Sequence, residues 1–326
     1  TEILKNKFLD HEIIELEERF HWSDLTEEMQ DEILSIKIKF QDHEVRLSDL
    51  IPKESKTADF LAIAELFKGN FNKISTPISL NDGYNLDFFI ERSLHNSKFN
   101  FNAENFNDFL NESEHHKVVL ISDEPGMGKS TMLSHIALKL KNRRPNHWVI
   151  RIDLNQHIMA FETEPDDVMN LIAFHFAKTQ SNFESYLLQE LFNNGKLILL
   201  LDGLDEIFPF YEQNFHHFLS NLNSSSVKQI WITMRPHLEA DLESKVDEIA
   251  WEMKPFNKTT QVEFITRYWK NKLNLKSNLD GKLTKAASDL LEHLIDSIDD
   301  DSLLLIGIPL QTRMIADIFY EDVKKN

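Results

Sequence analysis

The stretch KVVLISDEPGMGKSTMLSHIALKL, residues 117–140, has the pattern of a strand, a glycine-rich loop and a helix in direct succession. Residues 117–121 are β-branched and aliphatic, which is typical of a strand buried on both faces of a parallel sheet. In the loop DEPGMGKS, residues 123–130, Gly126 and Gly128 let the backbone bend until several N–H groups converge on one anion. The helix behind the loop points its positive end at that anion, so the stretch predicts a phosphate-binding loop.

Two side chains of this loop suit a nucleotide with its magnesium ion. Lys129 is long enough to reach the outer phosphates, and Ser130 offers a hydroxyl to Mg²⁺. The loop departs from the pattern GxxxxGK[ST] at its first position, where Asp123 replaces glycine. Asp123 and Glu124 would repel a polyphosphate unless their side chains turn away or face the metal. The alternative is a glycine-rich turn that contains Lys129 and Ser130 by coincidence.

Composition narrows the class of protein. The 326 residues carry 35 basic and 54 acidic side chains, for a net charge of −19, which argues against general nucleic-acid or anionic-membrane binding. The chain has no cysteine, so disulfides and cysteine-ligated zinc are excluded, as fits a cytoplasmic protein. We find neither a signal peptide nor an apolar run of membrane-spanning length. The chain stops directly after a helical pattern, so we expect it to be a fragment of a longer protein.

Hydrophobic periodicity divides the chain into three parts. Residues 1–80 form a mainly helical segment in which residues 36–47 alternate like a hairpin. Residues 81–254 alternate strands and helices from Lys117 onward, which predicts an α/β fold with a parallel sheet flanked by helices. Residues 255–326 are helical throughout. The expected sheet strands are residues 117–121, 147–154, 196–207, 228–233 and 249–253, and the other expected helices are two within residues 1–34 and one over each of residues 55–75, 129–140, 168–178, 183–192 and 211–222.

Acidic residues follow the most hydrophobic of these strands. Ligands of an open parallel sheet bind at the carboxyl ends of its strands, where the Asp202 carboxylate can hold Mg²⁺ through water. Many ATPases of this type carry the hydrolytic glutamate directly after such an aspartate, but here Gly203 intervenes before Asp205 and Glu206. Either acid could activate water, and their displaced position predicts slow turnover. The alternative for Asp202 and Asp205 is a pair of turn formers around Gly203.

Three further features each allow a simple structural explanation. Arg235 follows the strand over residues 228–233, where a guanidinium can bind the γ-phosphate, and a surface salt bridge explains it equally well. Pro309 suits the first position of the last helix, where proline is favoured. The segment HEIIE, residues 11–15, lacks the second histidine of HExxH, so we expect a simple polar segment there and not a zinc site.

Four motifs together resemble the NACHT family of signal-transducing P-loop ATPases over about residues 85–326. They are GKST (128–131), LILLLDGLDE (197–206), WITMRP (231–236) and GIPL (307–310). DGLDE is the most specific, because a metal-binding aspartate followed by a small residue and a second acidic pair is typical of this family. In WITMRP, Met234 stands where the family usually has a small residue.

By this resemblance the site binds ATP or ADP with Mg²⁺. Pro309 would lie against the adenine base, and FFIER, residues 88–92, would pass over it. The roles implied for the other residues are hydrolysis or phosphate sensing for Asp205, Glu206 and Arg235, metal binding for Ser130 and Asp202, and nucleotide binding for Gly126, Met127, Gly128, Lys129, Ser130 and Thr131.

The resemblance also implies a fold and a function. The fold is a P-loop NTPase sheet of five parallel strands, followed by a helical domain, residues 255–326, that closes over the nucleotide. The function is a switch in a larger innate-immune or cell-death receptor, which ADP holds as a closed monomer and ATP permits to oligomerise. The receptor's C-terminal sensor for an activating ligand would lie beyond Asn326, so we expect the fragment to be monomeric and a weak ATPase. Two alternatives are a conventional ATP-dependent enzyme and an interaction scaffold with a degenerate nucleotide site, for which Asp123 is the motive.

Overall fold

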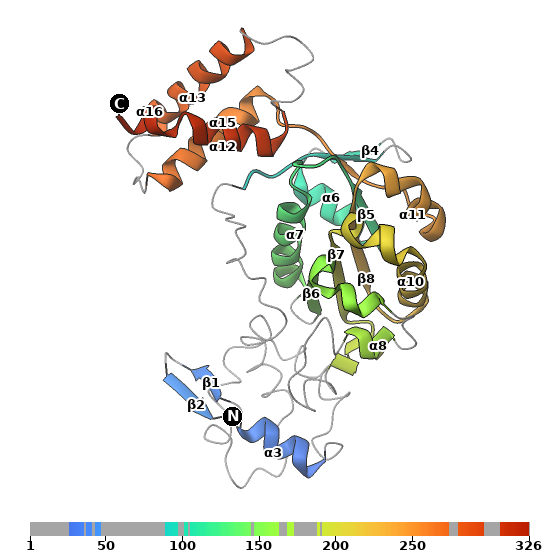
Figure 1. Cartoon of the computed structure of the whole chain (residues 1–326). Helices are drawn as coiled ribbons and strands as arrows, with labels where there is room; N and C mark the ends of the chain where they lie inside the picture. Colours follow the sequence, from blue (N-terminus) through green and yellow to red (C-terminus); the bar gives the residue numbers. More distant parts are fainter. Residues whose placement is uncertain are drawn as a thin grey trace.

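Figure 1 shows the fold of the chain, a computed structural model. It describes residues 26–35, 37–40, 43–46, 89–96, 101–103, 105–144, 147–162, 168–172, 188–189, 191–273, 280–296 and 307–325. None of the helices described in these ranges is both long and apolar enough to cross a membrane.

The centre of the fold is a parallel sheet of four strands in the order β5-β8-β7-β6. The strands are β5 (Val118–Ser122), β8 (Gln229–Met234), β7 (Leu197–Asp202) and β6 (Trp148–Asp153). Every residue of β5, β7 and β8 is buried, because apolar cores lie on both faces of the sheet. This burial explains why the strands read as continuous aliphatic runs in the sequence.

Alternate residues of each strand enter the cores of opposite faces. The helices that flank the sheet include α7 (Lys129–Arg143), α10 (Leu204–Ser224) and α11 (Glu239–Val246). Val119 of β5 lies in the same cluster as Ile136 of α7. Its neighbour Leu120 lies in the other cluster, with Phe215 of α10 and Leu242 of α11. The period of two along the strands thus fixes which helix covers which face.

A small antiparallel sheet in the order β4-β3-β9 was not expected from the sequence. Its strands are β3 (Leu94–Asn96), β4 (Phe101–Ala103) and β9 (Glu252–Met253), and α6 (Phe106–Ser113) follows β4. Asn105 is the N-cap of α6, and its side chain accepts a hydrogen bond from the Asp108 N–H. Strands of two or three residues are too short to show a hydrophobic period, so the sequence contains no signal for them.

The fifth parallel strand expected over residues 249–253 is not confirmed in the described part of the chain. Trp251 makes a single parallel bridge to Ile121 of β5, and the chain then enters β9, which pairs antiparallel with β3. The Met253 N–H donates to Asp123 Oδ2 at 2.9 Å. Because the Met253 N–H donates to a side chain, it makes no backbone hydrogen bond to β5, and the parallel pairing stops after Trp251.

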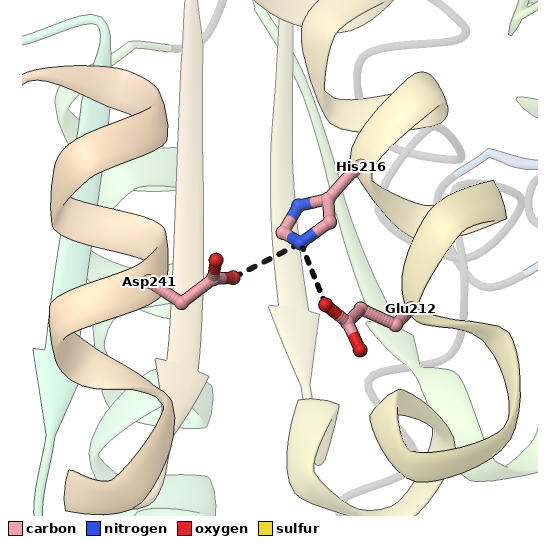
Figure 2. Close-up of side chains that lie close together, drawn as sticks. All are labelled: Glu212, His216 and Asp241. Carbon is pink, nitrogen blue, oxygen red and sulfur yellow. Dashed lines mark ion pairs between the residues drawn. The ribbon is translucent and has the colours of Figure 1, made fainter.

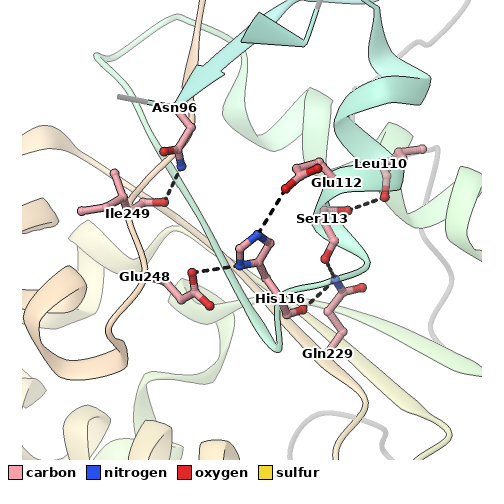
Figure 3. Close-up of polar contacts among 8 residues, drawn as sticks. All are labelled: Asn96, Leu110, Glu112, Ser113, His116, Gln229, Glu248 and Ile249. Atoms are coloured by element: carbon pink, nitrogen blue, oxygen red, sulfur yellow. Dashed lines mark hydrogen bonds and ion pairs between the residues drawn. The ribbon is translucent and has the colours of Figure 1, made fainter. Parts of the chain in front are cut away.

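Polar side chains join α6 and the loop after it to the amino end of the parallel sheet (Figure 3). The buried Gln229 donates from Nε2 to the carbonyls of Ser113 and His116, at 2.6 and 3.1 Å. The His116 ring lies 2.9 Å from a Glu248 oxygen, and Asn96 donates to the Ile249 carbonyl. These bonds lie opposite the carboxyl ends of the strands and attach the small sheet to the large one.

Helices after residue 255 have a core of their own. They are α12 (Lys258–Lys272), α13 (Asp280–Ile295), α15 (Pro309–Ile318) and α16 (Tyr320–Lys325). Trp269 is fully buried in this core, and its Nε1 donates to the Ala316 carbonyl at 2.7 Å. The helical character predicted for this part is confirmed in the described residues, and the boundary at residue 255 stays a prediction.

The hairpin predicted over residues 36–47 is confirmed. β1 (Lys37–Phe40) pairs antiparallel with β2 (His43–Arg46), and α3 (Glu27–Ser35) matches the second helix expected before them. The helix expected before residue 26 and the one over residues 55–75 lie outside the described residues. Of the helix expected over residues 168–178, only α8 (Val168–Leu171) is described as α-helix.

Candidate functional site

A cavity of about 400 Å³ opens where the carboxyl ends of β7 and β8 and the loop after β5 face α15. All residues predicted for the site line it: Gly126, Met127, Gly128, Lys129, Ser130, Thr131, Asp202, Asp205, Glu206, Arg235 and Pro309. They come from four separate segments of the chain. The structure therefore brings the predicted site residues together, and their individual roles stay predictions.

The loop before α7 has the backbone shape that its glycines permit. Gly126 and Gly128 have φ angles of 82° and 91°, in the left-handed region that other residues rarely adopt. Gly128 is the N-cap of α7, and a Cβ on it would meet nothing within 4 Å. The first turn of α7 therefore opens onto the cavity with room for an anion near its backbone N–H groups. The strand, loop and helix predicted for residues 117–140 are confirmed.

Lys129 lies against the carbonyls of its own loop. Its Nζ donates to the Asp123 carbonyl at 2.5 Å and to the Glu124 carbonyl at 3.0 Å. Burial lowers the pKa of Lys129, while the nearby Asp123 and Asp205 carboxylates raise it. The Lys129 ammonium is partly desolvated and held by neutral carbonyls, so a negatively charged phosphate oxygen would form a stronger hydrogen bond with it.

Asp123 turns its carboxylate away from the cavity. Oδ1 accepts a hydrogen bond from the Glu124 N–H and Oδ2 accepts one from the Met253 N–H, both at 2.9 Å. Burial raises the pKa of Asp123, and the two N–H groups together with Lys129 and Arg92 act against that rise. Of the two arrangements considered for this residue, the structure has the first. Asp123 joins the loop to β9 and does not line the cavity.

Asp202 has both carboxylate oxygens engaged. Oδ1 accepts a hydrogen bond from the Thr233 hydroxyl of β8, and Oδ2 lies 2.6 Å from Arg151 Nη2 of β6. The side chains of Asp202 and Arg151 are only 6% and 10% exposed, so this ion pair is buried. A carboxylate held in this way can bind Mg²⁺ through a water molecule, whereas direct coordination would require one of these bonds to break.

The helix after β7 begins earlier than the sequence indicated. α10 starts at Leu204, directly after Gly203 with φ of 75°, and it is kinked at Tyr211, where the helix expected over residues 211–222 begins. Its first turn therefore contains Asp205 and Glu206. Both acids lie within the strand expected over residues 196–207, but β7 ends at Asp202.

Arg235 forms an ion pair inside the cavity. Its Nε lies 2.6 Å from Asp205 Oδ2, so the salt bridge considered for Arg235 exists, and both residues line the cavity. Glu206 has a different environment. Burial raises its pKa, and the Asp153, Asp205 and Asp202 carboxylates raise it further, against the effect of Arg235. The Glu206 carboxylate is thus more basic than that of an ordinary glutamate.

Arg92 is a cavity residue that the sequence analysis named only within FFIER. It is 6% exposed, and its guanidinium donates to the Met127 carbonyl at 3.0 Å and to the Lys254 carbonyl. Its Cζ also lies 4.7 Å from the centre of the Phe256 ring. Burial lowers the pKa of Arg92 to about 10, which keeps it charged at neutral pH. In the sequence Arg92 stands between Glu91 and Ser93, and no local pattern identifies the carbonyls to which it donates.

Part of the cavity is apolar. It is lined by Phe89, Ile90, Met253, Phe256, Phe264, Pro309 and Leu310. Pro309 is the first residue of α15, as the structural explanation held, and it also lines the cavity. The Leu310 N–H donates to the Gly126 carbonyl at 3.1 Å, and a Cβ on Gly126 would lie 3.0 Å from Leu310 Cβ. The glycine-rich loop and the start of α15 are therefore in direct contact.

Comparisons with known proteins identify one family and several similar solved structures. The model of the NACHT domain family matches residues 117–272. Among solved structures, C. elegans PCH-2 is similar at 12% identity and a TM-score of 0.39, with 64% of this chain and 66% of that chain covered. Domain III of the Thermotoga maritima replication initiation protein DnaA is similar at 18% identity and a TM-score of 0.37, with 70% and 98% covered. No curated protein matches the chain.

Proposed function

Since residues 117–272 are a NACHT domain, of the P-loop NTPase class, we propose that the chain binds ATP or ADP with Mg²⁺ in this cavity and acts as a nucleotide-controlled switch. One observation carries the proposal. A cavity of about 400 Å³ is lined both by a glycine-rich loop with Lys129 and by aromatic and aliphatic side chains. Small-molecule sites have volumes of about 300–1,000 Å³ and combine these two kinds of lining.

In the polar part of the cavity, Lys129 would exchange the carbonyls of Asp123 and Glu124 for the outer phosphates. Mg²⁺ would be held by the Ser130 hydroxyl and, through water, by Asp202, and the ion would neutralise part of the phosphate charge. The donor set fits this metal, because Mg²⁺ takes oxygen ligands and keeps several waters. The bonds from Thr233 and Arg151 fix the Asp202 carboxylate in one orientation, which supports this assignment.

For hydrolysis we assign Glu206 as the group that activates water. Burial and the Asp153, Asp205 and Asp202 carboxylates raise the pKa of Glu206, which makes its carboxylate a stronger base than that of an ordinary glutamate. Arg235 would sense the γ-phosphate by releasing Asp205 and pairing with the phosphate. Because Glu206 does not follow the metal aspartate directly, we expect turnover to be slow.

In the apolar part, the adenine would lie between Pro309 and residues 89–92. Residues 255–326 would then be the domain that closes over the nucleotide. Contact between Leu310 and Gly126 supports this, since it joins that domain to the phosphate loop. The scaffold alternative rested on Asp123, and its motive is weakened because the Asp123 carboxylate binds backbone N–H groups outside the cavity.

The wider role that we propose is control of nucleotide-dependent oligomerisation in a larger innate-immune or cell-death receptor. Converting a two-state protein from mostly closed to mostly open takes about 5.5 kcal/mol of differential binding. One charge-assisted bond from Arg235 supplies roughly 1.5–3 kcal/mol. The γ-phosphate alone is therefore insufficient, and contacts with an activating ligand or a second protomer must supply the remainder.

Calorimetric titration with Mg·ADP and Mg·ATP tests nucleotide binding. We expect the wild-type chain to bind, and Lys129→Ala to bind at least roughly tenfold more weakly, because about 1.5–3 kcal/mol of charge-assisted bonding is lost. Lys139→Ala is the matched control, since Lys139 lies on the same helix and pairs with Glu91 outside the phosphate loop. Absence of binding by the wild-type chain, or equal binding by both variants, would contradict the proposal.

A further inference from the structure

Away from the nucleotide cavity, three side chains that can bind a metal converge between α10 and α11 (Figure 2). Glu212 and His216 project from α10, and Asp241 projects from α11 toward them. His216 Nε2 lies 2.9 Å from Asp241 Oδ2 and 3.8 Å from Glu212 Oε1. The three ligand atoms all lie within 4.8 Å of one another.

Local structure holds these side chains in place. Glu212 and His216 are four residues apart, so they share one face of α10. α11 packs beside α10 on the same face of the sheet and brings Asp241 opposite them. The His216 ring meets the Phe208 ring edge to face at a centroid distance of 5.3 Å, and its side chain is only 15% exposed. The imidazole therefore has a fixed orientation before any ligand arrives.

The polar atoms of this cluster lack the partners that buried polar atoms usually have. His216 Nε2 and Asp241 Oδ2 are both shielded from solvent, and no described residue makes a well-aligned hydrogen bond to either, although they lie 2.9 Å apart. A neutral imidazole with its lone pair on Nε2 would repel the carboxylate. Positive charge removes this conflict, whether it is a proton on Nε2 or a metal ion held between the two atoms, and an imidazole with two carboxylates is a suitable ligand set for a metal ion.

We propose that Glu212, His216 and Asp241 form a binding site for a divalent transition-metal ion, with Zn²⁺ as the best fit. Zn²⁺ accepts one imidazole nitrogen and two carboxylate oxygens, with water in the fourth position, at ligand distances of about 2.0–2.2 Å. Mg²⁺ and Ca²⁺ fit less well, because they prefer oxygen ligands alone. Small shifts of the exposed Glu212 side chain bring its oxygen within reach.

The site would fasten together α10, which carries two residues of the nucleotide cavity, and α11, which follows a third in the chain. The first turn of α10 contains Asp205 and Glu206, and α11 follows closely after Arg235. The Asp205 to Arg235 ion pair joins the same two parts of the chain. A metal ion between α10 and α11 is a second connection, and it would hold the two helices together when Arg235 releases Asp205 to pair with a phosphate.

Titration of the full chain with Zn²⁺, in excess Mg²⁺ and without nucleotide, tests the proposal. We expect the wild-type chain to bind one equivalent of Zn²⁺ that His216→Gln loses or binds roughly tenfold or more weakly, since even changes around a ligand cost about 10–100-fold. Asp241→Asn gives the same result by a second route, should His216→Gln fail to fold. His217→Gln is the matched control on the next residue of α10 and keeps the equivalent.

Asp202→Asn separates this site from the nucleotide cavity, because it changes the cavity and should leave Zn²⁺ binding unaltered. One equivalent of Zn²⁺ should also raise the urea midpoint of the wild-type chain and leave that of His216→Gln unchanged. The proposal is overturned if the wild-type chain shows no saturable Zn²⁺ binding. It is equally overturned if His216→Gln and Asp241→Asn bind Zn²⁺ as the wild-type chain does, or if Asp202→Asn alone abolishes the equivalent.

Discussion

Asp202 and Arg151 form a buried pair that no local pattern announces. The two residues are 51 positions apart and lie on neighbouring strands of the sheet. The sequence shows that Asp202 follows a buried strand, but the polar partners of a carboxylate depend on strand order. Because β6 lies next to β7 and β8 lies on its other side, Arg151 and Thr233 reach Asp202 from opposite flanks.

Replacing Arg151 by methionine should destabilise the fold by about 3–5 kcal/mol, because it leaves the Asp202 charge buried without its partner. Urea unfolding measures this change, with Arg143→Met as a control at an exposed arginine. Mg·ATP should reduce the difference in unfolding free energy between Arg151→Met and the wild type, since the metal ion would supply positive charge near Asp202. A variant as stable as the wild type would show that the ion pair contributes little.

The raised pKa of Glu206 predicts a pH dependence of ATP hydrolysis. A general base must be deprotonated, so the rate should fall as the pH drops through a pKa above the usual range of glutamate. The fold also favours protonated Glu206, so its contribution to the free energy of unfolding declines as the pH rises through that same range. Single-turnover rates of the wild type, Glu206→Gln and Asp205→Asn test this assignment. Loss of the rate in Asp205→Asn, with an unchanged profile in Glu206→Gln, would exchange the two roles.

At the scale of elements, the connection between the glycine-rich loop and α15 makes a sharper prediction. Gly126→Ala and Gly128→Ala should each lose about 1–2 kcal/mol from the left-handed backbone conformation. Only Gly126→Ala also forces a Cβ against Leu310, which should cost about 1–3 kcal/mol more by overpacking. Urea unfolding without nucleotide measures the difference. Equal destabilisation of the two variants would mean that α15 yields to the new methyl group.

The sequence predicts the large elements of this fold well, for a physical reason. Strands buried on both faces and amphipathic helices leave periodic apolar patterns, so β5, β6, β7, β8 and α7 were all expected. The expected fifth strand is not confirmed beyond one bridge, because apolar residues indicate burial and not backbone pairing. Trp251 and Met253 are buried as expected, but Asp123 takes the Met253 N–H, and this segment pairs with β3 instead.

The candidate site was predictable in its parts that belong to motifs. Lys129, Asp202, Arg235 and Pro309 all line one cavity. The role of Arg92 was not predictable, because its acceptors include the Lys254 carbonyl, 162 residues away, and a backbone carbonyl leaves no trace in the sequence. The outcome at Asp123 was likewise left open, since the direction of a side chain depends on which N–H groups the fold brings near it.

At the scale of the whole molecule, the glycine-rich loop contacts both the sheet and the C-terminal helices. Arg92 joins the Met127 carbonyl to the Lys254 carbonyl, where the chain leaves the sheet, and Leu310 joins α15 to Gly126. A ligand that orders the loop therefore acts on both connections. The proposed switch depends on this coupling of the loop to α15, because the nucleotide must affect more than the loop that binds it.

Amide hydrogen exchange with and without Mg·ADP tests this claim most directly. We predict that Mg·ADP slows exchange both in residues 123–131 and in residues 307–318, where the Leu310 N–H donates to Gly126, and that Lys129→Ala abolishes both effects. Protection of residues 123–131 with unchanged exchange over residues 307–318 would contradict the account.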